Sequence, residues 1–175
     1  MYKTFLKQKQ KPKKPSNLLT ENTQYKQVMI KIFQKAIKDE MFSAVAYTRI
    51  AESIKGFQQA EIAEMFKKHA KEESGDHFYE LMEYASGAGI INELCIKFDF
   101  SGYDMPVDFN LETIYAWKQN LENDAYMDYI NASNIARNEG DIITAEFFRE
   151  LAKDEKGHIQ DLLDYTDIGS ELIKF

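Results

Sequence analysis

Cysteine is almost absent from this sequence. The single residue, Cys95, leaves no partner for a disulfide within the chain and excludes metal sites that need several thiolates. Long apolar stretches are missing too, because no run reaches the roughly 18 residues that a membrane-spanning helix needs. No apolar segment typical of a signal peptide follows the basic N-terminus. We therefore expect a cytoplasmic protein that does not bind membranes.

Acidic residues are lacking at the N-terminal end. Residues 1–16 contain six lysines, two prolines and no acid, so we expect residues 1–19 to form a basic, flexible tail. The rest of the chain then carries 16 basic and 29 acidic side chains, a net charge of −13. Because this body repels phosphate, we expect the tail to solubilise or dock the protein rather than to bind nucleic acid.

Helical periodicity dominates the rest of the chain. Apolar residues recur three and four positions apart in four segments, residues 21–55, 58–85, 111–138 and 141–165. Short turns around Gly56 and at Glu139-Gly140 make antiparallel pairs of these helices. The sequence between the pairs, residues 86–107, is long enough to run back along a bundle.

The sequence therefore predicts an all-α protein with a single four-helix bundle. Two antiparallel helical hairpins, joined by the long crossover, occupy residues 20–168, and residues 169–175 form a C-terminal tail. Thr20 is expected to cap the first helix, and either Asn110 or Asp108 the third. Aromatic side chains are expected to pin the crossover or to form an oligomer contact. They are Phe98, Phe100, Tyr103 and Trp117.

Two glutamates stand where the helical pattern calls for apolar residues. Glu40 and Glu155 both lie on the inward-facing stripes of their helices. Burial of an unpaired carboxylate costs several kcal/mol or more, so buried charges are normally paired or bound to metal. Inward carboxylates on several helices would need a common explanation.

An internal repeat supplies the other members of the set. The first helix carries Glu40 and, two turns later, Tyr47; the third carries Glu122 and Tyr129 at the same spacing. In each half, a second glutamate follows the first after 33 residues, and a histidine lies close behind it. Repetition of both spacing and chemistry indicates one site built by four helices.

The histidine of the second helix interrupts the repeat. His158 follows Glu155 by three residues, but Asp76 stands three residues after Glu73 and the histidine, His77, stands four after it. A single π-helical turn near residues 74–75 would absorb the extra residue and turn His77 inward, with Asp76 outward. His77 also leaves the site neutral with two Fe(II), whereas Asp76 would give about −1, so we favour His77 and keep Asp76 as the alternative.

Four carboxylates and two imidazoles from four helices form the ligand set of bundle-core di-iron sites. Oxygen and nitrogen ligands without sulfur suit iron, with manganese as the alternative. The predicted ligands are Glu40, Glu73, His77, Glu122, Glu155 and His158. Tyr47 and Tyr129 are predicted to orient ligand carboxylates by hydrogen bonds. Glu72 and Asp154 are expected to be solvated acids, and His69 a histidine outside the ligand set.

The two Glu-x6-Tyr helices, the Glu-x-x-His motif and the 33-residue spacings resemble bacterioferritins, rubrerythrins and their ferritin-like relatives. The resemblance covers residues 24–165 and implies a ferritin-like di-iron centre that reacts with dioxygen or hydrogen peroxide. Ser74 replaces the methionine that binds haem in bacterioferritins, so no haem is expected. Ala125 replaces a further glutamate of rubrerythrins, and one cysteine cannot build their rubredoxin module, so we do not expect a complete rubrerythrin.

The resemblance implies a di-iron oxidoreductase, and Fe(II) oxidation for iron storage or detoxification is the expected activity. The expected partners are Fe(II), dioxygen or hydrogen peroxide, and further copies of the chain. One alternative is a rubrerythrin-like peroxidase or oxidase with a separate electron donor. Others are a di-iron oxygenase that acts on an organic substrate and a metal-free bundle that only binds partners.

Overall fold

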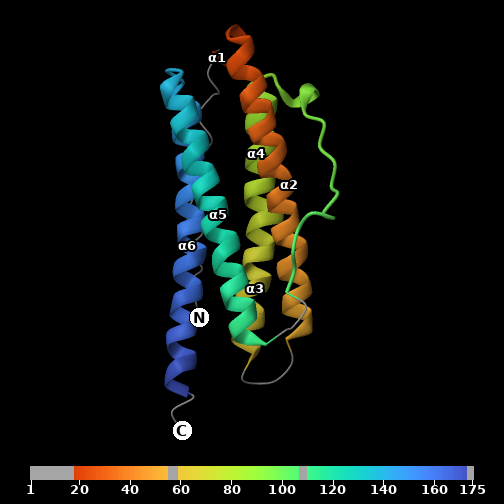
Figure 1. The fold of residues 1–175 in the computed structure, drawn as a ribbon, viewed down its shortest axis with the longest axis vertical. Helices are drawn as coiled ribbons and strands as arrows, with labels where there is room; N and C mark the ends of the chain where they lie inside the picture. The colour runs from red at the N-terminus through yellow and green to blue at the C-terminus, as the bar shows by residue number, and fades with distance from the viewer. Residues whose placement is uncertain (1–17, 55–58, 107–109, 173–175) are drawn as a thin grey trace, which may run out of the picture.

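The chain folds into a bundle of upright helices, seen in a computed structural model that describes residues 18–54, 59–106 and 110–172 (Figure 1). Four long helical columns confirm the predicted all-α four-helix bundle. Its elements are α1 (Leu18–Glu21), α2 (Thr23–Ser53), α3 (Ala60–Lys71), the π-helical η2 (Glu72–His77), α4 (Phe78–Gly87), the 3₁₀ turn η3 (Ile91–Glu93), α5 (Leu111–Asn138) and α6 (Ile142–Leu172).

The helices pair as two hairpins. The column formed by α3, η2 and α4 packs mainly against α2, whereas α5 packs mainly against α6. In Figure 1 the described part of the connection that follows α4 runs along the outer side of α2 toward the end of the bundle where α5 begins. The start of α5 therefore lies at the end of the bundle where α2 finishes, and the predicted crossover topology is confirmed.

Aromatic side chains attach the crossover to α2. Phe42 of α2 packs against Phe100 and Tyr103, with ring centroids 5.6 and 4.4 Å apart. The Tyr103 hydroxyl donates a hydrogen bond to the carboxylate of Asp39. Trp117 of α5 donates from Nε1 to the carbonyl of Asp104 over 2.8 Å. These contacts confirm that aromatic residues pin the crossover, although Phe98 remains 52% exposed.

Side-chain caps define the starts of the helices. Asn22, not Thr20, caps α2, since its side chain accepts from the backbone N–H of Tyr25 over 3.1 Å; the Thr20 prediction was wrong. Asn110 caps α5 as predicted, by accepting from the Thr113 N–H over 2.9 Å. Helix α6 ends later than predicted and continues through residues 169–172, which were expected to lie in a tail. Residues 1–17 and Asp108 lie outside the described residues.

Glycine makes the tight turn between α5 and α6. Gly140 has φ +79°, a backbone conformation that side chains with a Cβ rarely adopt. Its N–H bonds to the carbonyl of Arg137, and the next N–H, of Asp141, bonds to Ala136. This pattern is a Schellman motif. The Asp141 side chain then caps α6 by accepting from the Thr144 N–H over 3.0 Å, so one turn closes α5 and opens α6.

A polar layer divides the hydrophobic core into two parts. One cluster of buried residues spans residues 19–37, 81–90, 129–136 and 145–152. The second cluster includes Tyr47, Phe66, Ile114 and Leu162. Each helical column passes from one cluster to the other through a buried glutamate. The glutamates of all four columns therefore lie at one level, near the middle of the bundle.

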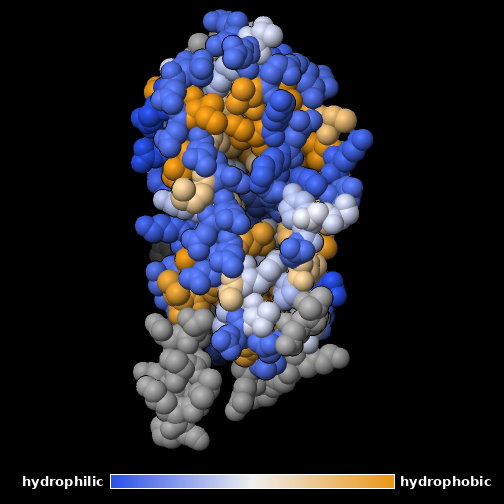
Figure 2. Space-filling view, viewed as in Figure 1, coloured by the Kyte–Doolittle hydropathy of each residue, from blue (hydrophilic) through white to orange (hydrophobic). Residues whose placement is uncertain are grey.

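The face of the bundle on which α2 and α5 lie is mainly polar. Figure 2 shows hydrophilic side chains over most of this face, with the largest hydrophobic group in its upper half and smaller ones below. Among the described residues, no helix is both long enough and apolar enough to cross a membrane.

The turn at Gly140 yields a stability prediction. Gly140→Ala should lower the free energy of unfolding by about 1 kcal/mol, because alanine is strained at positive φ. Gly157→Ala in α6 is the control, because a Cβ there meets nothing within 4 Å and φ is not positive. It should raise stability by up to about 1 kcal/mol. Denaturant unfolding of the metal-free protein measures both changes, and equal effects of the two variants would contradict the assignment.

Candidate metal centre

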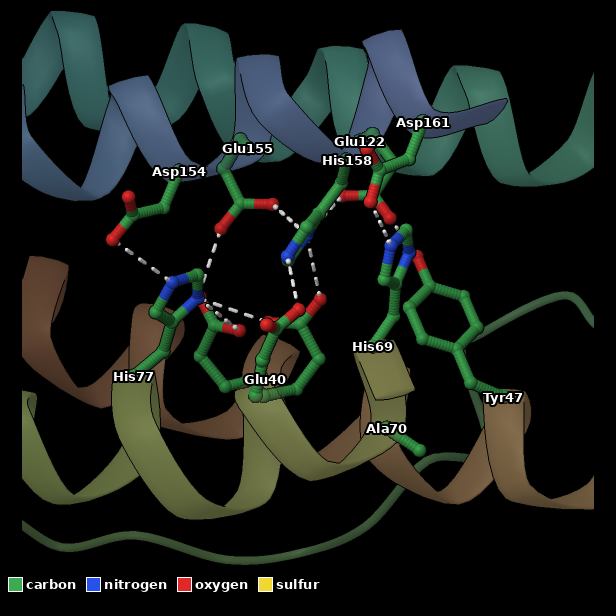
Figure 3. A network of polar contacts seen from close by, with 12 residues as sticks. Glu40, Tyr47, His69, Ala70, His77, Glu122, Asp154, Glu155, His158 and Asp161 are labelled. Carbon is green, nitrogen blue, oxygen red and sulfur yellow. Dashed lines mark hydrogen bonds and ion pairs between the residues drawn. The ribbon is translucent and has the colours of Figure 1, made fainter. Parts of the chain in front are cut away.

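The six predicted ligands lie together in the polar layer of the bundle. Each of these residues is at most 5% exposed, and Figure 3 shows Glu40, His77, Glu122, Glu155 and His158 converging from the helices that carry them. The six are Glu40, Glu73, His77, Glu122, Glu155 and His158. The helices thus bring all of these side chains into one buried cluster.

A π-helical turn directs His77 into this cluster. Within η2 the bonding is wider than in an α-helix, and the Phe78 N–H reaches the carbonyl of Glu73 five residues earlier. His77 is 1% exposed, whereas Asp76 lies on the surface. The predicted π-turn is therefore confirmed, and the geometry favours His77 over Asp76 as the inward donor.

His77 faces three carboxylates through one ring nitrogen. Its Nδ1 lies 2.9 Å from Glu73 Oε2, 3.0 Å from Glu155 Oε1 and 3.5 Å from Glu40 Oε2. These four residues offer one donor atom each, all within 4.8 Å of one another. They form the first donor set, which we call the His77 set.

His158 has the corresponding place in the other half of the cluster. Its Nδ1 lies 3.2 Å from Glu73 Oε1, 3.3 Å from Glu122 Oε2 and 3.5 Å from Glu155 Oε2. These residues form a second group of four donors, the His158 set. Glu73 and Glu155 belong to both sets and turn one oxygen to each histidine, the arrangement required of carboxylates that bridge two ions.

The donor atoms fit a pair of metal ions. His77 Nδ1, Glu73 Oε2 and Glu155 Oε1 are buried and form no hydrogen bond within the described part of the chain, although they converge to within about 3 Å. Buried polar atoms without partners are costly, and a cation at their meeting point would satisfy all three. Oxygen and nitrogen donors without sulfur match iron or manganese. The cluster is therefore consistent with a dimetal site.

The two tyrosines of the repeat hold the outer glutamates. Tyr47 on α2 donates over 2.7 Å to Glu122 Oε1 on α5, and Tyr129 on α5 donates to Glu40 Oε1 on α2. Each tyrosine therefore fixes the carboxylate of the opposite hairpin and leaves the second oxygen turned toward a histidine. Burial and the neighbouring carboxylates raise the pKa of both hydroxyls, which keeps them protonated as donors.

Two further carboxylates contact the far sides of the histidines. Glu72 Oε2 lies 3.2 Å from His158 Nε2, and Asp154 Oδ2 lies 3.6 Å from His77 Nε2. Such a carboxylate fixes the ring so that Nδ1 is free to bind metal. Glu72 and Asp154 are partly exposed to solvent, with side chains 33% and 45% exposed. Beyond that expectation, each also contacts a histidine of the other hairpin.

His69 lies next to the cluster. It is fully buried, stacks on the ring of His158 with centroids 4.3 Å apart, and shares a hydrogen bond with Asp161 over 3.1 Å. Burial, together with the nearby positive charge of Lys118, lowers the pKa of His69 to about 4. The ring lies outside both four-donor sets, but His69, Glu72 and His158 form a further group of possible donors, so its place outside the ligand set stays a prediction.

Sequence reasoning missed Lys118. This residue is fully buried on α5, one turn before Glu122, and its ammonium contacts Glu122 Oε1. It also lies 3.9 Å from the centroid of the Tyr47 ring. The sequence pattern that could have identified it is the position of Lys118 on the inward-facing stripe of its helix, four residues before the inward Glu122.

Burial and the neighbouring charges shift the pKa values of the four glutamates in two directions, upward for Glu40 and Glu155 and downward for Glu73 and Glu122. Burial and the charges of Glu73 and Glu155 raise the pKa of Glu40, and burial with the charge of Glu73 raises the pKa of Glu155 to about 7. Burial also acts on Glu122, but Lys118 and His158 hold its pKa well below the usual range. The pKa of Glu73 is lowered as well, since the contacts with His158 and His77 outweigh burial.

The carboxylates of the cluster favour the protonated form of both histidines when no metal is bound. Burial alone would lower the pKa of His77, but Glu40 and Glu155 raise it well above its ordinary value. The carboxylates around His158 have the same effect on its pKa. Metal binding must therefore displace protons from these rings.

The sequence and the fold are similar to those of known proteins. The rubrerythrin family model matches residues 31–165, which include all six core residues. A crystal structure of ferritin from M. penetrans superposes with a TM-score of 0.70 and 17% identity, covering 84% of this chain and 85% of that chain. At this identity the likeness shows a shared fold, and the predicted ferritin-like bundle is confirmed. No curated protein matches the chain.

The choice of His77 over Asp76 predicts metal stoichiometry. His77→Ala should remove tight binding of one of two Co(II) ions, because it deletes a buried donor of one set. Asp76→Ala is the control and should bind as the unaltered protein does, because Asp76 lies on the surface. Calorimetric titration of the metal-free protein measures both. Loss of an ion from the Asp76 variant alone would reverse the assignment.

The raised pKa values predict how the stability of the metal-free protein depends on pH. His77, His158 and Glu155 bind more protons in the folded than in the unfolded chain. This stabilisation is complete below the unfolded pKa values and is lost as pH rises through the folded ones. The lowered pKa of His69 acts in the opposite sense, but only below about pH 6.5.

Between about pH 6.5 and 8.5 the free energy of unfolding should therefore fall, by about 1–3 kcal/mol. Denaturant unfolding at several pH values measures it, and the Glu155→Gln variant should show a shallower fall. A rise in stability across this window would contradict the charge assignment.

Proposed function

Because this chain belongs to the rubrerythrin family, we propose that it holds two iron ions in its bundle and oxidises Fe(II) with dioxygen or hydrogen peroxide. The observation that carries the proposal is the pair of four-donor sets that share Glu73 and Glu155. Manganese is the alternative metal, and no haem is expected. The paired ions would supply the redox chemistry, since two Fe(II) give the two electrons that reduce dioxygen to peroxide or peroxide to water.

The chain's own residues would prepare the donors for these ions. Tyr47 and Tyr129 each occupy one oxygen of an outer glutamate, which leaves the other oxygen for metal. Glu72 and Asp154 contact the far nitrogens of the histidines, so that each Nδ1 presents its lone pair inward once its proton has left. The hydrophobic clusters on both sides of the polar layer exclude bulk water from it.

A cavity connects the surface with the polar layer. It has a volume of about 230 Å³, lies between α2 and α5 beneath the crossover, and reaches Glu40, Glu122 and Glu155. This volume is below the roughly 300–1,000 Å³ of pockets that take drug-sized ligands. A space of this size suits ions, dioxygen and hydrogen peroxide better than a bulky organic substrate.

Acidic side chains line the outer part of the cavity. The lining includes Asp39, Asp104, Asp124 and Asp128, whereas its one lysine, Lys35, is already paired with Asp39 and Asp128 over 2.6 and 2.7 Å. A negative field of this kind concentrates dications and steers them inward. This supports Fe(II) itself as the substrate, for iron storage or detoxification within a homo-oligomer.

A second candidate function follows from the family. A peroxidase that takes electrons from another protein would use the same donor sets, with hydrogen peroxide as the substrate. Ala125 lines the cavity at the position of the further glutamate of rubrerythrins, so this chain lacks that carboxylate. For this reason we place Fe(II) oxidation first.

Removal of a shared carboxylate tests the proposal. Glu73→Ala and Glu155→Ala should each reduce the initial rate of Fe(II) oxidation at least about 100-fold, because each deletes a donor of both sets. Glu150→Ala is a matched control on α6, since Glu150 lies on the surface and pairs only with Lys153 among the described contacts. Stopped-flow absorbance of ferric product measures the rate.

Both core variants should remain helical by circular dichroism. The metal-free stability of Glu155→Ala should not fall, because the change relieves repulsion between buried carboxylates, whereas Glu73→Ala also removes the contacts of Glu73 with both histidines. Wild-type oxidation rates in both core variants would refute the proposed function.

A further inference from the structure

The two donor sets differ by one buried positive charge. Glu122 Oε1 receives two donors, the hydroxyl of Tyr47 and the ammonium of Lys118. Glu40 Oε1 receives the hydroxyl of Tyr129, its counterpart in the repeat. The residue that corresponds to Lys118 is Ala36, four positions before Glu40. The two halves of the repeat therefore differ at this position, with lysine in one half and alanine in the other.

The environment of Lys118 keeps its charge close to the His158 set. The side chain is fully buried, and its ammonium lies 3.9 Å from the centroid of the Tyr47 ring and 5.7 Å from that of Phe66. Both rings present aromatic surface to the cation, which holds it by cation–π attraction. The ammonium therefore stays on the carboxylate that supplies the outer donor of the His158 set.

This charge acts on the two sets unequally. Glu122 belongs to the His158 set and not to the His77 set. A dication bound at Glu122 would share that carboxylate with an ammonium, whose like charge repels it. The charge balance changes as well, since four carboxylates neutralise two dications and Lys118 adds one positive charge. The loss of binding free energy therefore falls mainly on the second ion, the one at the His158 set.

We propose that Lys118 makes the two metal sites unequal, so that the His77 set binds its ion first and tightly while the His158 set binds second, more weakly and exchangeably. This inference rests on the proposed function, because it assumes that the bundle takes two ions. It assigns distinct roles to the sets. The His77 set would hold the more tightly bound ion, and the His158 set would be the exchangeable position at which substrate Fe(II) enters; each would supply one of the two electrons. Lys118 is a positioning residue in this scheme.

Titration of the metal-free protein with Co(II) tests the inequality without any turnover. Calorimetry should resolve two steps whose dissociation constants differ by about tenfold or more. Lys118→Met removes the charge at nearly constant length, and it should tighten the second step about tenfold while the first stays unchanged. Lys118→Arg keeps the charge and should keep two separate steps, and Lys153→Met on the surface is the control for loss of a lysine.

Histidine variants show which donor set gives the tight binding step and which gives the weak one. They do not depend on whether the Lys118 variants fold. His158→Ala should retain the tight step, and His77→Ala should retain only the weak one. Equal affinities in the unaltered protein, the reverse assignment of the steps, or an unchanged second step in Lys118→Met would each overturn the inference. Failure of the proposed function looks different, because the unaltered protein would then bind one Co(II) or none.

Discussion

The mutual burial of four carboxylates and two imidazoles across the middle of the bundle is the constraint on which the rest of the structure depends. Four negative charges in a buried layer repel one another, and the raised pKa values of the histidines, Glu40 and Glu155 favour protonated forms that relieve this repulsion when metal is absent. Two dications neutralise the carboxylates more completely. The layer is thus built for cations, and the packing on either side of it serves to keep water out.

Each departure from a regular bundle can be traced to this layer. The π-turn at residues 72–77 accommodates one extra residue so that His77 faces the carboxylates. The tyrosines cross between hairpins because an outer glutamate needs one oxygen fixed and the other free. The crossover, held on α2 by Phe42, covers the cavity that leads to the same carboxylates. Connection, helix distortion and hydrogen bonding therefore all act on a single buried site.

Sequence pattern was sufficient for the bundle, the crossover, the polar layer and the π-turn, because each depends on periodicity and spacing, which can be read along one chain. It failed where the outcome depends on neighbours from another helix. Periodicity puts Lys118 on an inward stripe but says nothing of its contacts with Glu122 and Tyr47. Glu72 looks solvated until α6 brings His158 beside it. The cap of α2 was misplaced because Thr20 and Asn22 are both good caps, and backbone geometry decided between them.

The crossed tyrosines have a consequence for symmetry. A hairpin of this type holds one outer glutamate, one shared glutamate and one histidine, but its tyrosine reaches the glutamate of the other hairpin. Neither half can therefore complete a site alone, whereas two copies of one half, related by a twofold axis through the polar layer, would complete it fully. The chain repeats this arrangement in its two halves and departs from it at two points, with an extra residue in the first half and a lysine in the second. Because both halves lie in one chain, their sequences can differ, and two otherwise equivalent metal positions need not be identical.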